Sequence, residues 1–337
     1  MRIGVIGSGA IGCLVAAYLK LEGQDVSLVG RPDSVEAIKN KGLQISGVRG
    51  SFNVEIKISG QLNYFPELVI LATKTQDIEY AIKDNLSLIR NALILTIQNG
   101  VQADRIVSGF LPKKNIISSI VMFGSTYLEP AKLVHNFEGP WIIGWPFEEK
   151  HPEVLSDLSR ILNKAFPVVI ADNITGMKFL KIFANANNCL PAILGKSMQE
   201  VFSDHDISRI SIAIWKEALE VVNGSGIKLV SLPNFPAENI TKLTSLPIAQ
   251  AAEIFSQTMR NLSKEPLYGS ILQSIMRGRS SEIDYINGEF VRLAEKRHAG
   301  APLNKVLVEL VHQVEKNKKF YSKAELFENI QKVVKLR

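Results

Sequence analysis

The chain has 337 residues, of which 46% are hydrophobic and 21% are charged, a composition that excludes a mainly disordered protein and predicts two domains. The net charge is +6, but Lys and Arg are scattered, which favours a basic pocket for an anionic small molecule over a nucleic-acid surface. Two cysteines and the lack of a long apolar run predict neither a disulfide framework, nor a metal site, nor a membrane span, as is typical of a cytoplasmic protein.

The first half of the chain alternates predicted strands and helices. Apolar, β-branched runs predict strands at 2–7, 25–31, 67–74, 92–100, 115–124 and 166–172, a hairpin within 44–60 and two more strands within 132–145. Amphipathic segments predict helices at 10–23 and 153–165. Buried strands separated by helices predict an α/β domain with a parallel-rich sheet covered on both faces.

Strand patterns stop at about residue 174, and helical periods follow. Helices are predicted at 175–195, 204–225, 247–262, 280–298 and 302–316. The tail at 316–337 carries one more amphipathic segment, which we expect to be a packing or dimer-contact helix. The sequence therefore predicts an α/β domain at 1–173 and an all-α domain at 174–337.

A glycine pattern, G-x-G-x-x-G, follows the first predicted strand and opens the first predicted helix. In that context it predicts a dinucleotide site, because glycines allow a tight turn and a close approach to pyrophosphate at the helix N-terminus. The predicted cofactor loop consists of Gly7, Ser8, Gly9, Ala10, Ile11 and Gly12. The alternative is a glycine-rich turn without a ligand.

Arg31 follows the second predicted strand, where an NAD-binding domain usually carries an acid for the ribose hydroxyls. A guanidinium at this position suits a 2′-phosphate and can stack on adenine, so we expect NADP(H) as the cofactor. Asp33, two residues later, favours NAD instead, because it is an acid near the same position. The alternative for Arg31 is a solvated turn residue without a cofactor contact.

Three later strands end in residues that could line the same rim: Lys74, Asn99 and Gly124. Ligands of such sheets bind outside the carboxyl ends of the strands. A Lys there can pair with a phosphate, and an Asn can present its amide to ribose or substrate. We therefore count all three as cofactor-binding candidates.

The predicted helix at 176–195 carries a polar stripe. Lys181, Asn185, Asn188 and Cys189 fall on one face of a continuous helix. A reductase needs a proton donor for the oxygen left after hydride transfer, and a desolvated Lys with a lowered pKa can serve. The alternative is a stripe that faces solvent.

The segment SSEIDYINGEF at 280–290 places Ile283, Ile286 and Phe290 at helical spacing, as one buried face, with Glu282 at its start. Glu282 is either a site residue or an acid favoured near a helix N-terminus.

These features occur in a fixed order along the chain: the Gly7–Gly12 turn, Arg31, Lys74, the QNG triplet at 98–100, Lys181 with Asn185, and the segment 270–290. Together they resemble the ketopantoate reductase (2-dehydropantoate 2-reductase) family over roughly residues 1 to 315. The resemblance implies an NADP-binding Rossmann domain at 1–173, followed by a helical substrate and dimerisation domain at 174–337, of the 6-phosphogluconate dehydrogenase type. It also implies hydride transfer from NADPH to 2-dehydropantoate, which yields pantoate for coenzyme A synthesis.

The resemblance also implies roles for individual residues. Lys181 would be the general acid, and Asn185 would bind the substrate. Asn99 would contact both cofactor and substrate, and Ser270 would hold the substrate carboxylate. Glu282 would act in the catalytic set and hydrogen-bond at the cofactor ribose. The implied partner is a small 2-oxo acid, and the chain could form a homodimer.

The chain also departs from the family pattern. The family's substrate helix usually carries a second Asn and then Pro, where this chain has Cys189 and Leu190, so Cys189 takes that substrate-binding position. Gln199 stands where Asn is common, and Ala131 where Gly is usual. These departures leave two alternatives: a paralogous reductase of another 2-oxo acid, or a non-catalytic NADP-binding sensor.

Overall fold

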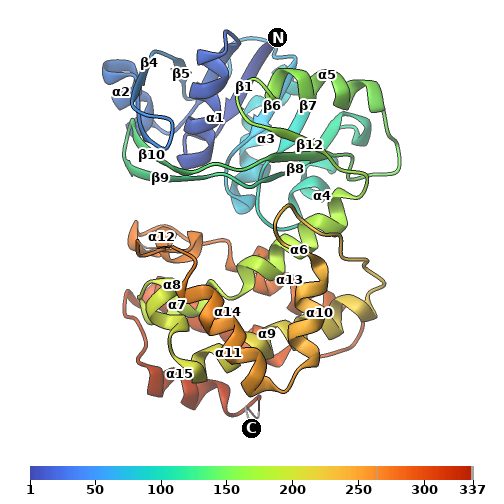
Figure 1. The fold of residues 1–337 in the computed structure, drawn as a ribbon. Coiled ribbons are helices and arrows are strands. Elements are labelled where there is room, and N and C mark those ends of the chain that lie inside the picture. Colours follow the sequence, from blue (N-terminus) through green and yellow to red (C-terminus); the bar gives the residue numbers. More distant parts are fainter. Residues whose placement is uncertain (264, 335–337) are drawn as a thin grey trace. The chain divides into compact units, whose positions relative to one another are not determined.

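The computed structural model describes residues 1–263 and 265–334, and it divides the chain into two compact units (Figure 1). Unit 1 runs from Met1 to Thr175, and unit 2 from Gly176 to Arg337. The first unit is an α/β unit and the second is helical, as the sequence predicts. None of the described helices is long and apolar enough to span a membrane.

Unit 1 is built on an eight-stranded sheet of order β12-β11-β8-β7-β6-β1-β2-β5. The strands from β5 to β8 in this order run parallel, β11 is antiparallel to β8, and β12 is parallel to β11. The bounds are β1 Arg2–Ile6, β2 Asp25–Val29, β5 Lys57–Ser59, β6 Leu68–Leu71, β7 Leu93–Thr96, β8 Ile116–Val121, β11 Trp141–Gly144 and β12 Val168–Ile170. The predicted parallel-rich sheet is confirmed.

Helices cover both faces of this sheet. Alternate residues of the central strands, such as Ile70 and Leu71 of β6, enter two separate hydrophobic clusters on opposite faces. The first cluster includes α1 (Ala10–Leu21) and α5 (Pro152–Leu162), and the second includes α3 (Ile78–Ile89) and α4 (Ala103–Ser108). Burial on both faces explains why the strands are apolar runs without alternation.

A second sheet, of order β4-β3-β10-β9, packs against α1 in the first cluster (Figure 1). Its strands are β3 Leu43–Gly47, β4 Phe52–Val54, β9 Gly124–Glu129 and β10 Lys132–Phe137. The prediction of one hairpin at 44–60 is wrong in part, because β3 and β4 pair here whereas β5 joins the large sheet. The predicted strand at 115–124 corresponds to β8, whereas β9 was not predicted as a separate strand.

Unit 2 consists of short and medium helices that pack around α9 and α14. The helices are α6 Ile174–Ala186, α7 Cys189–Leu194, α8 Met198–Phe202, α9 His205–Gly224, α10 Ala237–Ser245, α11 Ile248–Arg260, α12 Ser270–Met276, α13 Asn287–Glu295, α14 Pro302–Asn317 and α15 Lys323–Ile330. Glu217 of α9 accepts from the backbone N–H groups of Leu303 and Asn304, which caps the start of α14.

The predicted continuous helix at 175–195 is wrong, because the structure ends α6 at Ala186 and starts α7 at Cys189. Pro191 explains the break. It has no N–H to donate to the carbonyl of Asn187, four residues earlier, and its ring excludes that carbonyl. The N–H of Leu190 bonds to the Asn187 carbonyl instead.

The single helix predicted at 280–298 is also wrong. A 3₁₀ turn at Ile283–Tyr285 precedes α13, and Ile286 between them has φ −112° and ψ −90°. The buried face predicted from the same segment is confirmed, since Ile283, Ile286 and Phe290 are fully buried.

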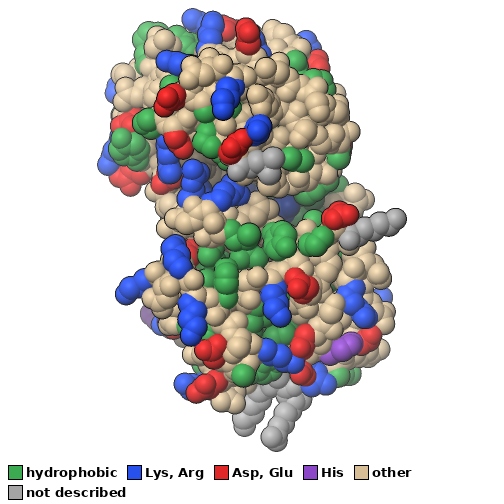
Figure 2. Space-filling model, turned by 90° about the vertical axis from the view of Figure 1, so that its left-hand side faces the viewer, with side chains coloured by type: hydrophobic (Ala, Val, Ile, Leu, Met, Phe, Trp, Pro, Cys, Tyr) green, Lys and Arg blue, Asp and Glu red, His purple; other side chains and the backbone are tan. Residues whose placement is uncertain are grey.

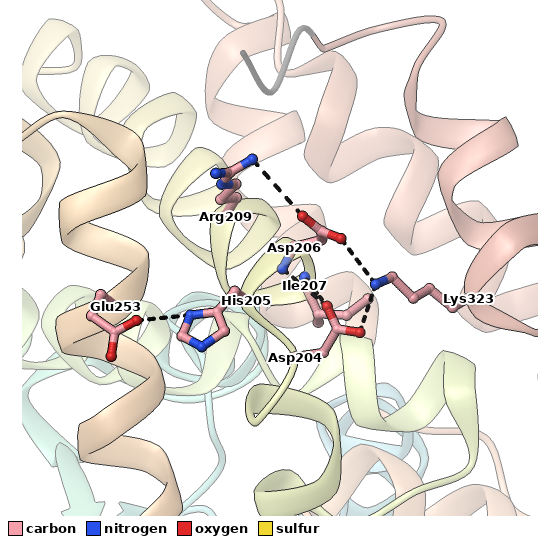
Figure 3. Close-up of polar contacts among 7 residues, drawn as sticks. All are labelled: Asp204, His205, Asp206, Ile207, Arg209, Glu253 and Lys323. Carbon is pink, nitrogen blue, oxygen red and sulfur yellow. Dashed lines mark hydrogen bonds and ion pairs between the residues drawn. The ribbon is translucent and has the colours of Figure 1, made fainter.

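The tail forms α15, which packs on unit 2 through Leu326 and Ile330, both fully buried. Lys323 donates to Asp204 at 2.6 Å and to Asp206 at 3.0 Å, at the N-terminus of α9 (Figure 3). The Tyr321 N–H donates to the carbonyl of Ile193 in α7. The tail is thus a packing helix, and residues 335–337 of that prediction lie outside the described residues.

Candidate active site

The centre of the large sheet has a topological switch point. β1 lies between β2 and β6, so the chain leaves β1 towards one side and later returns on the other. The carboxyl ends of the parallel strands β1, β6 and β7 meet at one edge of the sheet. Crevices at such points are the usual ligand sites of open α/β sheets.

The three glycines after β1 have different surroundings. A Cβ on Gly7 would lie 2.5 Å from the Ala72 carbonyl carbon, and Gly7 has φ +120°. A Cβ on Gly12 would lie 1.9 Å from the Gly7 oxygen. A Cβ on Gly9 would meet nothing within 4 Å. Gly7 and Gly12 therefore serve the turn and the packing, while Gly9 leaves open space for a ligand.

The helix that follows is suited to an anion. Gly9 is the N-cap of α1, and no side chain caps that helix end. The first N–H groups of a helix have no intrahelical partner, and the helix dipole adds positive potential there. The open face of Gly9 and this helix N-terminus fit a dinucleotide pyrophosphate.

Arg31 lies at the N-cap of α2 (Pro32–Lys41), and its side chain is 64% exposed. A guanidinium nitrogen lies 3.5 Å from an Asp77 carboxylate oxygen, which holds Arg31 near the chain segment that follows β6. The end of β2 carries no acid, since Gly30 follows Val29. A Cβ on Gly30 would lie 2.5 Å from the Ser8 hydroxyl oxygen, so this position favours glycine.

Lys74 and Asn99 follow the neighbouring strands β6 and β7, and both are half-buried. Gly124 begins β9, where a Cβ would lie 2.3 Å from the Phe137 ring. Packing against Phe137 therefore accounts for this glycine without a cofactor. A cofactor contact at Gly124 stays a prediction.

Gln98 is a polar residue that the sequence interpretation passed over. Its side chain is nearly buried, and its Nε2 donates to the carbonyls of Leu71 and Thr73, at 2.8 and 2.9 Å. The signal was available in the sequence, since a polar residue at the end of a buried strand needs a partner.

Lys181 and Asn185 lie one turn apart on α6, and both are half-buried. Burial lowers the pKa of the Lys181 ammonium from its ordinary value. A lysine with a lowered pKa can release a proton more readily at neutral pH. The sequence-based expectation of a desolvated lysine is thus supported by this shift.

The helix break separates the rest of the predicted polar stripe. Asn188 is the N-cap of α7, and Cys189 is its first residue. Cys189 is fully buried, and burial raises the pKa of its thiol to about 12, so nucleophilic chemistry is not expected of it. The substrate contact predicted for Cys189 stays a prediction. The predicted stripe assumed an unbroken helix, and that assumption is wrong between Ala186 and Cys189.

Asn188 instead packs beside the start of α12. A Cβ on Gly269 would lie 3.0 Å from the Asn188 amide carbon, although Gly269 has an ordinary φ of −64°. Gly269 thus makes room for the Asn188 side chain. Ser270, the candidate for the substrate carboxylate, is the next residue and is exposed.

Gln199 has a structural role in the same region. Its Nε2 donates to the carbonyls of Ser263 and Glu265, and its Oε1 accepts from the Leu267 N–H. Gln199 therefore anchors the backbone of Ser263, Glu265 and Leu267, which precede Ser270 in the chain. Its difference from the family's usual Asn does not by itself indicate another substrate.

Glu282 is half-buried and lies between two anchored neighbours. The Ser281 N–H donates to Glu315 of α14 at 2.6 Å, and His312 of α14 lies 2.9 Å from Asp284. The pKa of His312 is raised, because hydrogen bonds and attraction to Asp284 and Glu315 outweigh its burial. The loop that carries Glu282 is thus tied to α14.

Charge and potential metal ligands are distributed widely. On the face drawn in Figure 2, Lys and Arg side chains are interspersed with Asp and Glu on both units. Within residues 1–263 and 265–334, no group of three His, Cys, Asp or Glu side chains is arranged to hold a metal ion.

The glycine turn, the uncapped start of α1 and the switch point define a dinucleotide-binding protein of the Rossmann type. The model of the family described as ketopantoate reductase PanE/ApbA matches residues 3–146, and the model of the C-terminal part of that family matches residues 173–315. The chain therefore belongs to the ketopantoate reductase family. It is an oxidoreductase of the type that acts on CH–OH groups.

Relatives of nearly the same length support this membership. The 2-dehydropantoate 2-reductase of Pyrococcus horikoshii is 28% identical over 314 residues, which cover 92% of this chain and 96% of that protein. The corresponding protein of Archaeoglobus fulgidus is 25% identical over 93% of this chain and 98% of its own length.

Solved structures show the same fold. A PanE/ApbA family ketopantoate reductase from Ralstonia eutropha JMP134 has a TM-score of 0.78 and 25% identity, and the match covers 94% of this chain and 99% of that one. A D-mandelate dehydrogenase in complex with NADH and anilino(oxo)acetate has a TM-score of 0.80 and 24% identity over the same shares.

Proposed function

We propose that this protein reduces 2-dehydropantoate to pantoate with NADPH. The observation that carries the reaction type is Lys181, a half-buried lysine with a lowered pKa. Its position on α6, within the C-terminal family match, agrees with the family's activity. The cytoplasmic location and the homodimer predicted from the sequence stay predictions.

Unit 1 is proposed to hold the cofactor. The open face of Gly9 and the start of α1 would hold the pyrophosphate, and the exposed guanidinium of Arg31 would hold the 2′-phosphate. Asp77 stays close enough to orient that guanidinium. NADPH, when bound, supplies the hydride.

Unit 2 is proposed to supply the proton and the substrate contacts. Lys181 would donate a proton to the oxygen that gains negative charge when the keto carbon is reduced. Asn185, one turn further along α6, would orient the substrate, and the hydroxyl of the exposed Ser270 would donate to its carboxylate. The contacts predicted for four further residues stay predictions: those of Glu282, Lys74, Asn99 and Gly124.

The second candidate is a reductase of a different 2-oxo acid. The buried Cys189 favours it, because the family's second substrate Asn is missing at that position. A site that hydrogen-bonds a substrate hydroxyl rejects acids that lack it, so loss of that polar partner would relax the selectivity for 2-dehydropantoate. Asn188, which lies against Gly269, is the side chain that could compensate for this loss.

The test is a comparison of NADPH oxidation at 340 nm with 2-dehydropantoate and with a panel of other 2-oxo acids. The same assays are run with NADH, because a protein of the same fold binds NADH. The proposal expects the highest kcat/KM with 2-dehydropantoate and NADPH. A higher kcat/KM with another 2-oxo acid would identify that acid as the substrate in place of 2-dehydropantoate. No turnover with any acid would contradict the reductase assignment.

A further inference from the structure

We infer that Gln98 is a positioning residue for the reaction: it joins the loops after β6 and β7 and thereby fixes Asn99 relative to Lys74. The inference rests on the proposed function, because it assigns those two residues to the cofactor and substrate. Gln98 itself contacts neither ligand in this inference.

The first step is the geometry of the Gln98 amide. Its Nε2 lies 2.8 Å from the carbonyl oxygen of Leu71, the last residue of β6, and 2.9 Å from that of Thr73. Both acceptors are carbonyls, so the amide orientation is fixed with its nitrogen towards them. One primary amide thus uses both of its hydrogens on the loop that carries Lys74.

The second step is the burial of this contact. Gln98 is 5% exposed, and its Oε1 is buried without a hydrogen-bonding partner among the described residues. A buried unpaired acceptor destabilises a protein. An apolar side chain of the same shape would avoid that cost but would leave the Leu71 and Thr73 carbonyls without the Gln98 donor. The amide is therefore best explained by the loop contact it makes.

The third step concerns the far end of the loop that follows β7 and carries Asn99. Asp104, in the first turn of α4, accepts from the Thr96 hydroxyl and from the Ser118 hydroxyl, the latter at 2.6 Å. All three side chains are buried. Asp104 thus ties the end of the 97–103 loop back to β7 and β8. Asn99 lies between this anchor and Gln98.

Two anchors on a short loop restrict the position of the side chain between them. Catalytic and binding groups lose much of their effect when they are displaced by about 1 Å. Loss of the Gln98 amide should therefore impair both cofactor binding and the chemical step, because Lys74 and Asn99 would no longer be held together.

The experiment compares wild type, Gln98→Glu and Gln98→Met. A carboxylate keeps the shape but cannot donate, and it would face two carbonyl oxygens, whereas Met only removes the donors. The matched control is Gln44→Glu, since Gln44 is a half-buried glutamine of β3 opposite Lys132 in the four-stranded sheet. The NADPH Kd, the substrate KM, kcat and the Tm are measured for each, at a temperature well below every Tm.

The expected result for Gln98→Glu is an increase of about tenfold or more in the NADPH Kd together with a lower kcat. Gln98→Met should also raise the NADPH Kd and lower kcat, but by smaller factors. Gln44→Glu should leave both values unchanged. If Gln98→Glu does not fold, Gln98→Met decides the question.

A Gln98 variant that folds, with Kd, KM and kcat all within twofold of wild type, would overturn the inference, even if its Tm is lower. Failure of the proposed function is distinguishable from this result. If the proposed function fails, wild type itself will show no turnover. The NADPH Kd of the Gln98 variants, compared with that of wild type, will still report whether Gln98 positions the loop.

Discussion

At the scale of single residues, two glycines of the turn after β1 should have different roles: Gly12 should be required for folding, and Gly9 for cofactor binding. Gly12→Ala would place a methyl group 1.9 Å from the Gly7 oxygen, so we expect a loss of folding stability of about 1–3 kcal/mol or more. Gly9→Ala would meet no atom within 4 Å, so its Tm should stay near that of wild type. NADPH binding should nevertheless be lost, because the methyl group would occupy the space for the pyrophosphate. Thermal melts and NADPH titrations test the pair, and unimpaired binding by Gly9→Ala would contradict the assignment.

Arg31 tests the choice of cofactor. Arg31→Ala should weaken NADPH binding by about tenfold or more, since it removes a charge-assisted contact to the 2′-phosphate. NADH carries no such phosphate, so its affinity should change little. Titration of both nucleotides gives the comparison. An equal loss for the two would show that Arg31 serves another role.

Site residues were predictable from the sequence where the backbone conformation or the charge of a ligand requires one type of amino acid. Gly7 and Gly12 are needed because no Cβ fits, and Arg31 is placed by the end of β2. Gln98 and Asn188 could not be assigned in the same way. Their roles depend on Thr73 and Gly269, which are distant in sequence and become neighbours only in the fold.

At the scale of helices and strands, the docking of α15 shows which of two contacts stabilises the tail. Lys323 and its partners Asp204 and Asp206 are substantially exposed, and such ion pairs contribute at most about 1 kcal/mol (Figure 3). Leu326 is fully buried, and Leu-to-Ala changes at such positions cost about 2–5 kcal/mol.

We therefore expect Leu326→Ala to lower the free energy of unfolding by at least twice as much as Lys323→Ala. Urea denaturation gives the two values, and limited proteolysis reports release of the tail. If Lys323→Ala proves the more damaging change, the ion pairs at the start of α9 hold the tail.

The link between α14 and the Glu282 loop should depend on pH. The pKa of His312 is raised in the folded state by Asp284 and Glu315, against the effect of burial. The imidazolium therefore stabilises the fold fully below its unfolded pKa of about 6.5, and this contribution is lost as the pH rises through the folded pKa. The Tm difference between wild type and His312→Gln should be larger at pH 6 than at pH 9. Asp284→Asn should reduce this dependence, and a difference independent of pH would contradict the link.

Most elements were predictable from apolar runs, and the errors have local causes. Pro191 divides the expected long helix into α6 and α7, because the carbonyl of Asn187 loses its helical donor. The apolar spacing of Ile283, Ile286 and Phe290 was correct, but Ile286 adopts a non-helical backbone that spacing does not reveal. Membership of β5 in the large sheet depends on long-range pairing with β2.

At the scale of the whole molecule, the proposed mechanism assigns the cofactor contacts to residues of unit 1 and the proton donor, Lys181, to unit 2. The lowered pKa of Lys181 predicts that kcat falls at high pH, as the ammonium loses its proton. Because burial disfavours the charged form, this fall should begin below the ordinary lysine pKa of about 10.4.

The most direct test is the rate of NADPH oxidation with 2-dehydropantoate for wild type and Lys181→Met, across a pH series. A methionine keeps the length of the side chain but cannot donate a proton. The account predicts turnover by wild type that declines at alkaline pH, and a kcat at least about 100-fold lower in Lys181→Met with an unchanged NADPH Kd. Equal rates for the two proteins would contradict the role of Lys181, and with it the proposed mechanism.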